Sequence, residues 1–170
     1  MSNCSAQTLL GECVALDALV LREHTELAGD AFDLTQHRQR LQQTLATAEV
    51  CAVRRNKRLV AYATLSVDLA GGFGFVTAFN THPAHRGAAV MRELLAAVAA
   101  AVLRLRVSEL RSNVYKTNRP SMAFHRRLGF RVTRENEKGV EFTARVAELL
   151  ARPVVARAAS TAERPAAPIC

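Results

Sequence analysis

The sequence predicts a single α+β domain. Some stretches carry apolar residues every three or four positions, as amphipathic helices do, and others alternate apolar with polar residues, as half-buried strands do. The chain has 170 residues, 49% of them hydrophobic, which is enough for one buried core. We therefore expect one domain over residues 1–150, followed by a tail over residues 151–170.

The first half of the chain is expected to form two helices and a three-stranded meander. Apolar residues at helical spacing, such as Cys13, Leu16 and Val20, indicate the first helix, and Asp33 is placed to cap the second. A basic hairpin loop and a Gly-Gly turn separate short alternating stretches that indicate strands. The expected elements are helices over residues 12–28 and 34–48 and strands over residues 50–54, 59–67 and 73–81.

The second half is expected to add two helices and three strands. An Ala/Leu-rich stretch predicts a long helix, and Pro120 and Gly129 mark the start and stop of a short one. The expected elements are helices over residues 88–106 and 119–128, a strand over residues 109–115 and a hairpin over residues 130–146. Beyond residue 150 the composition shifts to Ala, Pro and Arg without apolar periodicity, so residues 151–170 are predicted to be disordered.

The charge balance predicts an anionic partner. A formal net charge of +8 and a pI near 10.2 suit nucleic acid, a membrane surface or a polyphosphate cofactor. Nucleic acid is disfavoured because two Tyr and no Trp offer little stacking surface. No apolar run is long enough to span a bilayer and no signal-peptide pattern is visible, so we expect a cytoplasmic protein that does not bind membranes.

The four cysteines, Cys4, Cys13, Cys51 and Cys170, have no close spacing and no His partners at metal-ligand intervals. His82 and His85 are three residues apart, but no third ligand is near them in the sequence. We therefore predict free thiols in a reducing compartment and no metal site.

Two motifs in the second half point to a function. The first is Pro83-Ala-His-Arg86-Gly87-Ala-Ala89-Val-Met91, which opens the long Ala/Leu-rich helix. The second is Asn118-Arg-Pro-Ser121-Met-Ala-Phe-His125-Arg-Arg-Leu-Gly129-Phe130. Together they resemble the acyl-coenzyme A site of the GNAT N-acetyltransferase superfamily, over roughly residues 49–143.

The resemblance implies the GNAT fold, a mixed sheet flanked by helices in which two neighbouring parallel central strands splay apart. Coenzyme A places its pantetheine arm in that gap, and the strands here are residues 73–81 and 109–115. The family consensus for the first motif is Pro-x-x-Arg-Gly-x-Gly-x-Gly/Ala, so Ala89 and Met91 replace glycines. The bulk of Met91 predicts weakened phosphate binding.

The first motif is expected to bind the pyrophosphate of acetyl-CoA, the predicted co-substrate. A helix start leaves backbone N–H groups without intrahelical partners, and these form an anion site together with the helix dipole. Gly87 is expected to let the backbone turn, and Arg86 to add a cation. The predicted cofactor-binding residues are Phe79, Asn80, Thr81, Arg86, Gly87, Ala88, Ala89, Val90, Met91 and Asn118.

The predicted catalytic residues are Asn118 and His125, which lie seven residues apart on one face of the short helix. The resemblance implies that the residue at position 125, commonly Tyr, protonates the departing thiolate. An unperturbed His is about one quarter protonated at pH 7 and is a stronger acid than Tyr. The alternative is that His125 packs beside the cofactor.

The general base is left open by the sequence. Ribosomal-protein acetyltransferases of the family have a Glu at the position of Asn113, and an amide cannot take a proton. The substitutes are Glu109, Asp68, Glu141 and His82, among which the sequence gives no preference.

These features predict an acyltransferase, specifically an N-acetyltransferase that moves an acetyl group from acetyl-CoA to a primary amine by direct attack in a ternary complex. The resemblance places the amine-bearing acceptor, a small molecule or a protein, between the N-terminal helices and the last hairpin. The alternative function is a CoA-binding regulatory module with a degenerate catalytic site. The exposed face of the long helix is a candidate contact for a homodimer.

Overall fold

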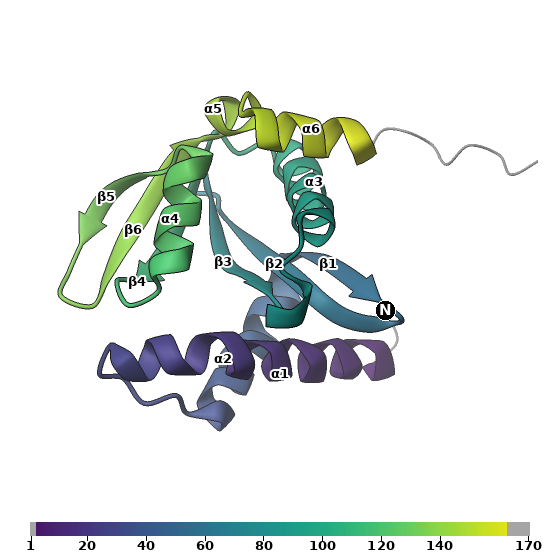
Figure 1. The fold of residues 1–170 in the computed structure, drawn as a ribbon, viewed down its shortest axis with the longest axis vertical. Coiled ribbons are helices and arrows are strands. Elements are labelled where there is room, and N and C mark those ends of the chain that lie inside the picture. The colour runs from purple at the N-terminus through teal and green to yellow at the C-terminus, as the bar shows by residue number, and fades with distance from the viewer. Residues whose placement is uncertain (1–2, 163–170) are drawn as a thin grey trace, which may run out of the picture.

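A mixed six-stranded sheet with the strand order β1-β2-β3-β4-β6-β5 forms the centre of the structure (Figure 1). This computed structural model describes residues 3–162. The elements are α1 (Asn3–Leu27), α2 (Leu34–Thr47), β1 (Glu49–Arg55), β2 (Arg58–Asp68), β3 (Phe73–Thr81), η1 (Pro83–His85), α3 (Ala88–Leu105), β4 (Glu109–Tyr115), α4 (Arg119–Leu128), β5 (Arg131–Glu135), β6 (Gly139–Arg145), α5 (Val146–Leu150) and α6 (Pro153–Ala162). The predicted α+β class is confirmed.

Three elements have the predicted bounds, namely the two central strands and the helix that carries the second motif. β3, β4 and α4 begin and end at the expected residues. Asp33 caps α2 as predicted, because its side chain accepts a hydrogen bond from the Gln36 backbone N–H at 3.0 Å. Helix α1 starts earlier than predicted, since Leu10 extends its buried stripe toward the N-terminus.

The two central strands splay apart. β3 and β4 are parallel, and they pair in register only from Phe73 with Glu109 to Phe75 with Arg111. Beyond these pairs the strands diverge toward α1 (Figure 1). The pairing of β3 with β2 skips Thr77, and such a bulge bends a strand where the divergence begins. The predicted splay is confirmed.

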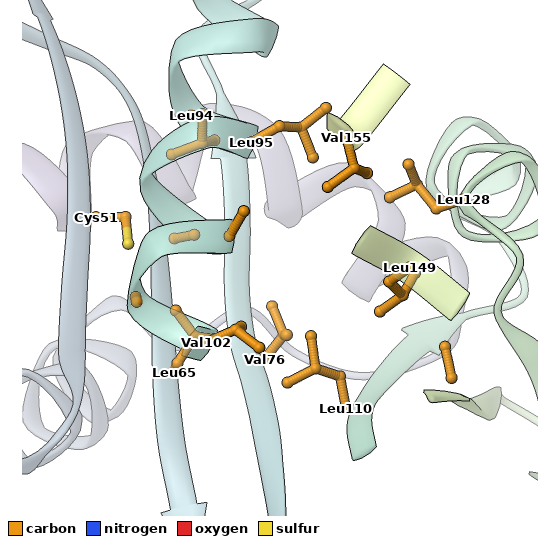
Figure 2. Close-up of a cluster of buried hydrophobic side chains, with 14 of the residues drawn as sticks. Cys51, Leu65, Val76, Leu94, Leu95, Val102, Leu110, Leu128, Leu149 and Val155 are labelled. Carbon is orange, nitrogen blue, oxygen red and sulfur yellow. The ribbon is translucent and has the colours of Figure 1, made fainter. Parts of the chain in front are cut away.

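Helix α3 packs its apolar side on β1, β2 and β3 (Figure 2). Leu94 and Ala101 of α3 are fully buried, and Leu65 of β2 is 1% exposed. Several alanines on this side of the helix let it approach the sheet closely, which accounts for the Ala/Leu-rich composition of the segment.

The prediction of a disordered tail is wrong for residues 153–162, which form α6. Pro153 starts this helix, and Val155 and Ala158 lie three residues apart on its buried side. They belong to the same core cluster as α3, and α6 lies against α3 in Figure 1. The small Ala side chains gave the segment no visible periodicity. The rest of the predicted tail, residues 163–170, lies outside the described part of the chain.

A buried carboxylate joins the N-terminal helices to the sheet. Asp17 of α1 is 2% exposed and accepts hydrogen bonds from the Tyr62 hydroxyl at 2.6 Å, Asn80 Nδ2 at 2.7 Å and His37 Nε2 at 2.8 Å. Burial and the charge of Asp17 raise the pKa of Tyr62, so its hydroxyl stays protonated as a donor. One side chain therefore connects α1, α2, β2 and β3.

Two of the four thiols are described, and both are buried and unpaired. Burial raises the pKa of Cys13 to about 12 and that of Cys51 to about 11, which keeps both thiols protonated and unreactive. Across residues 3–162, no helix has the length and apolar character needed to cross a membrane.

Replacement of Asp17 tests the buried network. Asp17→Ala leaves the Tyr62 hydroxyl and the Asn80 amide buried without their acceptor, so we expect the free energy of unfolding to fall by about 3 kcal/mol. Glu23→Ala, at an exposed position of the same helix, should change it by less than ~0.5 kcal/mol. Denaturation in guanidinium chloride measures both. A loss no larger than that of Glu23→Ala would contradict the structural role of Asp17.

The docking of α6 is tested by two neighbouring valines. Val155 is 6% exposed and Val154 is 42% exposed. Val155→Asp buries a carboxylate against α3 and should cost about 3 kcal/mol of stability, whereas Val154→Asp should cost less than ~0.5 kcal/mol. Thermal and chemical denaturation compare the two variants. Equal stability of the pair would support the disordered tail instead.

Candidate functional site

The loop between β3 and α3 leads to backbone amides without helical partners. His82 Nδ1 accepts from the Ala84 N–H at 3.2 Å and so caps the η1 turn. The first hydrogen bond at the start of α3 runs from the Met91 N–H to the Gly87 carbonyl at 3.1 Å. The amides of Ala88, Ala89 and Val90 precede it, and no side chain caps this helix end. Such a helix start is an anion site.

The side chains of the first motif divide between solvent and core. Arg86, Ala88 and Ala89 are exposed, whereas Val90 is buried. Met91 packs against the core cluster, so its bulk lies away from the exposed side of the loop. The expected obstruction of the phosphate site by Met91 therefore has no support in the structure.

Gly87 does not perform the predicted backbone role. Its φ of −75° and ψ of 159° are open to any residue, and a Cβ added there would meet nothing within 4 Å. Neither the backbone angles nor the space around Gly87 therefore requires a glycine at this position.

The side chains of the three predicted residues at the end of β3 are already engaged in contacts within the protein or are buried. The Phe79 ring lies 5.2 Å from the Phe124 ring of α4, Asn80 donates to Asp17, and Thr81 is 8% exposed. Asn80 is therefore a structural link rather than a free polar group. A ligand in the gap would meet this stretch mainly through its backbone.

Helix α4 is capped as the sequence predicts. The Asn118 side-chain oxygen accepts from the Ser121 N–H at 3.1 Å, Pro120 lies in the first turn, and Gly129 ends the helix with a φ of 95°. The side-chain NH₂ of Asn118 has no protein partner among the described residues, so it can donate to a ligand.

His125 is buried among aromatic rings. It is 7% exposed, its ring stacks on Phe142 with centroids 4.9 Å apart, and the Phe130 ring meets it edge-on at 5.1 Å. Nδ1 donates to the Ser121 carbonyl at 2.8 Å, so the neutral ring carries its proton on Nδ1. His125 and Asn118 each hydrogen-bond to the backbone of Ser121, and no hydrogen bond between their side chains is present in the described part of the chain.

Burial lowers the pKa of His125, although the hydrogen bond to Ser121 opposes the shift. The imidazolium fraction at pH 7 is therefore below the quarter that an unperturbed His would have. His125 also lines an apolar cavity of about 60 Å³ together with Val76, Phe79 and Phe124. At neutral pH this site holds a neutral imidazole.

A larger polar cavity of about 670 Å³ lies between the α1–α2 loop and the strands β4, β6 and β5. Asp30 accepts from Lys138 Nζ at 2.5 Å and from the Tyr115 hydroxyl at 3.2 Å, which joins the loop to the β5–β6 turn. The bond to Lys138 lowers the pKa of Asp30. Asn113 and Glu141 also line this cavity.

The structure places the four general-base candidates in different environments. Glu109 pairs with Arg111 at 2.7 Å where β3 and β4 are still in register. Asp68 caps a turn by accepting from the Gly71 N–H at 2.7 Å, and His82 caps η1. Glu141 alone among them lines the polar cavity.

The sequence did not reveal the role of Asp17. An Asp within the apolar stripe of α1 was the available signal, because a carboxylate at helical spacing from Cys13, Leu16 and Val20 must be paired when it is buried. Among the residues that the structure describes, no group of three or more His, Cys, Asp or Glu is arranged to hold a metal ion.

Solved structures share this fold at low identity. PaiA N-acetyltransferase from Thermoplasma acidophilum, in complex with coenzyme A, has a TM-score of 0.66 and 11% identity, covering 80% of this chain and 92% of that one. Ribosomal-protein-alanine N-acetyltransferase from Brucella melitensis has a TM-score of 0.58, 19% identity and coverages of 85% and 96%. YncA, a putative acetyltransferase from Salmonella typhimurium with acetyl-CoA, has a TM-score of 0.55, 18% identity and coverages of 81% and 90%.

The sequence itself has one informative match. No curated protein matches the chain. The profile of the acetyltransferase (GNAT) family matches residues 15–130, which run from within α1 to just beyond α4 and contain both motifs. The chain belongs to the acetyltransferase (GNAT) family.

Proposed function

We propose that this chain is an acetyl-CoA dependent N-acetyltransferase that transfers the acetyl group to a primary amine by direct attack. The observation that carries the proposal is the position of the uncapped start of α3. It follows the end of β3, beyond the last residues that pair with β4, so an anion site adjoins the unpaired part of the central strands.

The cofactor would lie between the start of α3 and the unpaired parts of β3 and β4. The amides of Ala88, Ala89 and Val90 would bind the pyrophosphate, and Arg86 would add a positive charge at the exposed loop. The NH₂ group of Asn118 lies at the start of α4, on the other side of the gap, and would donate to the cofactor there. Coenzyme A and acetyl-CoA in the solved structures of PaiA and YncA support this assignment.

The chain would supply two kinds of assistance to the transfer. The neutral amine attacks the thioester carbonyl carbon, and a backbone amide in the segment Phe79 to Thr81 would stabilise the oxyanion. The C–S bond then breaks, and the thiolate needs a proton. His125 would deliver it from Nε2 in its protonated form, because Nδ1 is held by the Ser121 carbonyl.

A CoA-binding regulatory module is the second candidate function. The buried, predominantly neutral state of His125 favours it, and so does the amide of Asn113 where ribosomal-protein acetyltransferases have a carboxylate. This alternative predicts saturable binding of acetyl-CoA without release of free thiol on addition of any amine.

The phosphate site is tested with two arginines. Arg86→Ala should weaken acetyl-CoA binding about tenfold, because it removes one charge-assisted contact at an exposed site. Arg92→Ala, exposed on the second turn of α3, should leave the affinity within about twofold. Calorimetric titration at moderate salt gives both values. Absence of binding by the unmodified chain would overturn the proposed function.

The acid role of His125 is tested by its pH dependence. The protonated form is lost as pH rises through a pKa below 6.5, so the ratio of wild-type to His125→Phe turnover should be largest at low pH and fall toward one above about pH 8. The ring touches phenylalanines and the Ser121 carbonyl, and no charged side chain of residues 3–162 contributes to the shift of its pKa. Thiol release measured from about pH 5.5 to pH 8.5 gives the ratio. A ratio independent of pH would identify a packing residue.

A further inference from the structure

Glu141 and Asn113 are direct cross-strand partners. Asn113 of β4 faces Glu141 of β6 in the antiparallel register. Side chains of such partners project from the same face of a sheet, with Cβ atoms about 5 Å apart. A carboxylate therefore lies beside the amide that cannot take a proton.

The Glu141 carboxylate is held in place from β5. The pairing of β5 with β6 skips Thr133, and the Thr133 hydroxyl lies 3.2 Å from Glu141 Oε1. Arg134 Nε lies 4.0 Å from the same oxygen, and the Glu141 side chain is 17% exposed. The group is oriented and largely shielded, yet it still opens into the polar cavity.

The cavity adjoins the gap in which the transfer is proposed. Asn113 lies two residues beyond the last β3–β4 pair, which ends at Arg111, so it flanks the unpaired part of β4. Glu141 lies one strand further from the gap, which is about 5 Å. That distance is short enough for a single water molecule to relay a proton, and such a relay is sufficient for a general base.

Other carboxylates near the site are already occupied. Asp17 is 2% exposed and accepts from three side chains, so it has no access to an acceptor. Asp30 is bonded to Lys138 and to the Tyr115 hydroxyl. Glu135 also lines the cavity, but its side chain is 67% exposed and lies 3.4 Å from Lys116. Among these three cavity carboxylates, Glu141 is the most shielded, at 17% exposure, and the farthest from its cationic partner, at 4.0 Å.

We propose that Glu141 is the general base for a polar aliphatic amine bound in the cavity lined by Asp30, Asn113, Tyr115, Lys138 and Glu141. The inference rests on the proposed N-acetyltransferase function. An aliphatic ammonium group has a pKa near ~10, so it must lose a proton before it can attack. The charged and amide side chains in this lining can hydrogen-bond to a polar amine, which an apolar aromatic amine would leave unpaired.

The proton balance of the step is as follows. Glu141 takes one proton from the ammonium group, directly or through one water, and passes it to solvent. The amine lone pair forms the C–N bond, and the C–S bond breaks with its electrons on sulfur. The nitrogen loses its second proton as the amide forms, and the thiolate gains one. The net reaction releases one proton for each amide and free thiol formed.

The test compares two probe nucleophiles with the full-length chain. Ethanolamine is almost fully protonated at about pH 7.5, as the lysine ammonium is, whereas hydroxylamine is largely neutral and needs no base. The assay follows the release of free coenzyme A thiol. Glu141→Gln should lower kcat/KM with ethanolamine about 100-fold and change it less than about threefold with hydroxylamine.

Two further variants separate the base from a packing role. Asn113→Glu combined with Glu141→Gln moves the carboxylate across the strand pair and should restore at least about tenfold of the lost rate with ethanolamine. Glu137→Gln, exposed in the β5–β6 turn and outside the cavity, should match wild type. Calorimetry with acetyl-CoA and thermal unfolding confirm that each variant is folded and binds the donor.

Several outcomes would overturn the assignment of Glu141. These are near wild-type rates for Glu141→Gln with ethanolamine, equal losses with both nucleophiles without rescue, or a wild-type chain that acetylates hydroxylamine alone. A wild-type chain that binds acetyl-CoA and releases no thiol with either nucleophile would instead overturn the proposed function, and the inference with it.

Discussion

The gap between the central strands depends on the hydrogen bonds of the buried Asp17 carboxylate. The central strands part after three registered pairs, so the backbone ladder no longer fixes their separation. Helix α1 takes over this function, since Asp17 binds Asn80 of β3, and the His24 carbonyl accepts from the Thr117 hydroxyl beyond β4 at 2.8 Å. The two anchors lie seven residues apart, about 10 Å along the helix, which matches a gap wider than one strand spacing.

Two polar connections of the N-terminal helices, the Asp17 network and the Asp30–Lys138 pair, differ in burial. The Asp17 network is buried, and breaking it leaves unpaired polar groups in the core. The Asp30–Lys138 pair over the polar cavity is instead partly exposed, with side chains 35% and 48% accessible. Exposed ion pairs contribute little net stability, so the α1–α2 loop can leave the β5–β6 turn at small cost. The buried Asp17 network therefore contributes more to the stability of the fold than the exposed Asp30–Lys138 pair does.

The sequence predicted the elements whose ends are marked by local chemistry. Pro120 and Gly129 bound α4, and Asp33 caps α2, because these residues act on their own neighbours. Helix α6 was not predicted because its buried face includes Ala158, and a small alanine contributes little to a recognisable apolar periodicity. The direction of the Met91 side chain and the backbone conformation of Gly87 also depend on packing, so the spacing of residues in the sequence could not predict them.

The functional polar groups were harder to predict because each depends on a partner distant in sequence. Asp17 is explained by its hydrogen bonds to Tyr62 and Asn80. The position of Glu141 is explained by its cross-strand register with Asn113, which exists only once the sheet has formed. The four candidate bases could be identified in the sequence, but their positions relative to the site could not. Strand register supplies the position, because a carboxylate one strand away shares the same face of the sheet.

Under the proposed mechanism, the two proton transfers use opposite faces of the sheet. His125 stacks on Phe142 with the core cluster of α3 and α4, whereas Glu141, next to Phe142 in β6, projects from the other face. A proton taken up by Glu141 enters a polar cavity and exchanges with solvent, so it need not return to sulfur. Burial makes the His125 imidazolium scarce but more acidic, which suits a group that gives up its proton once in each turnover. Because the base and the acid lie on separate faces, Glu141 can be hydrated while His125 is surrounded by aromatic rings. Water favours the carboxylate that Glu141 needs before it takes a proton. The aromatic surroundings favour the neutral imidazole that His125 becomes after it has given its proton away.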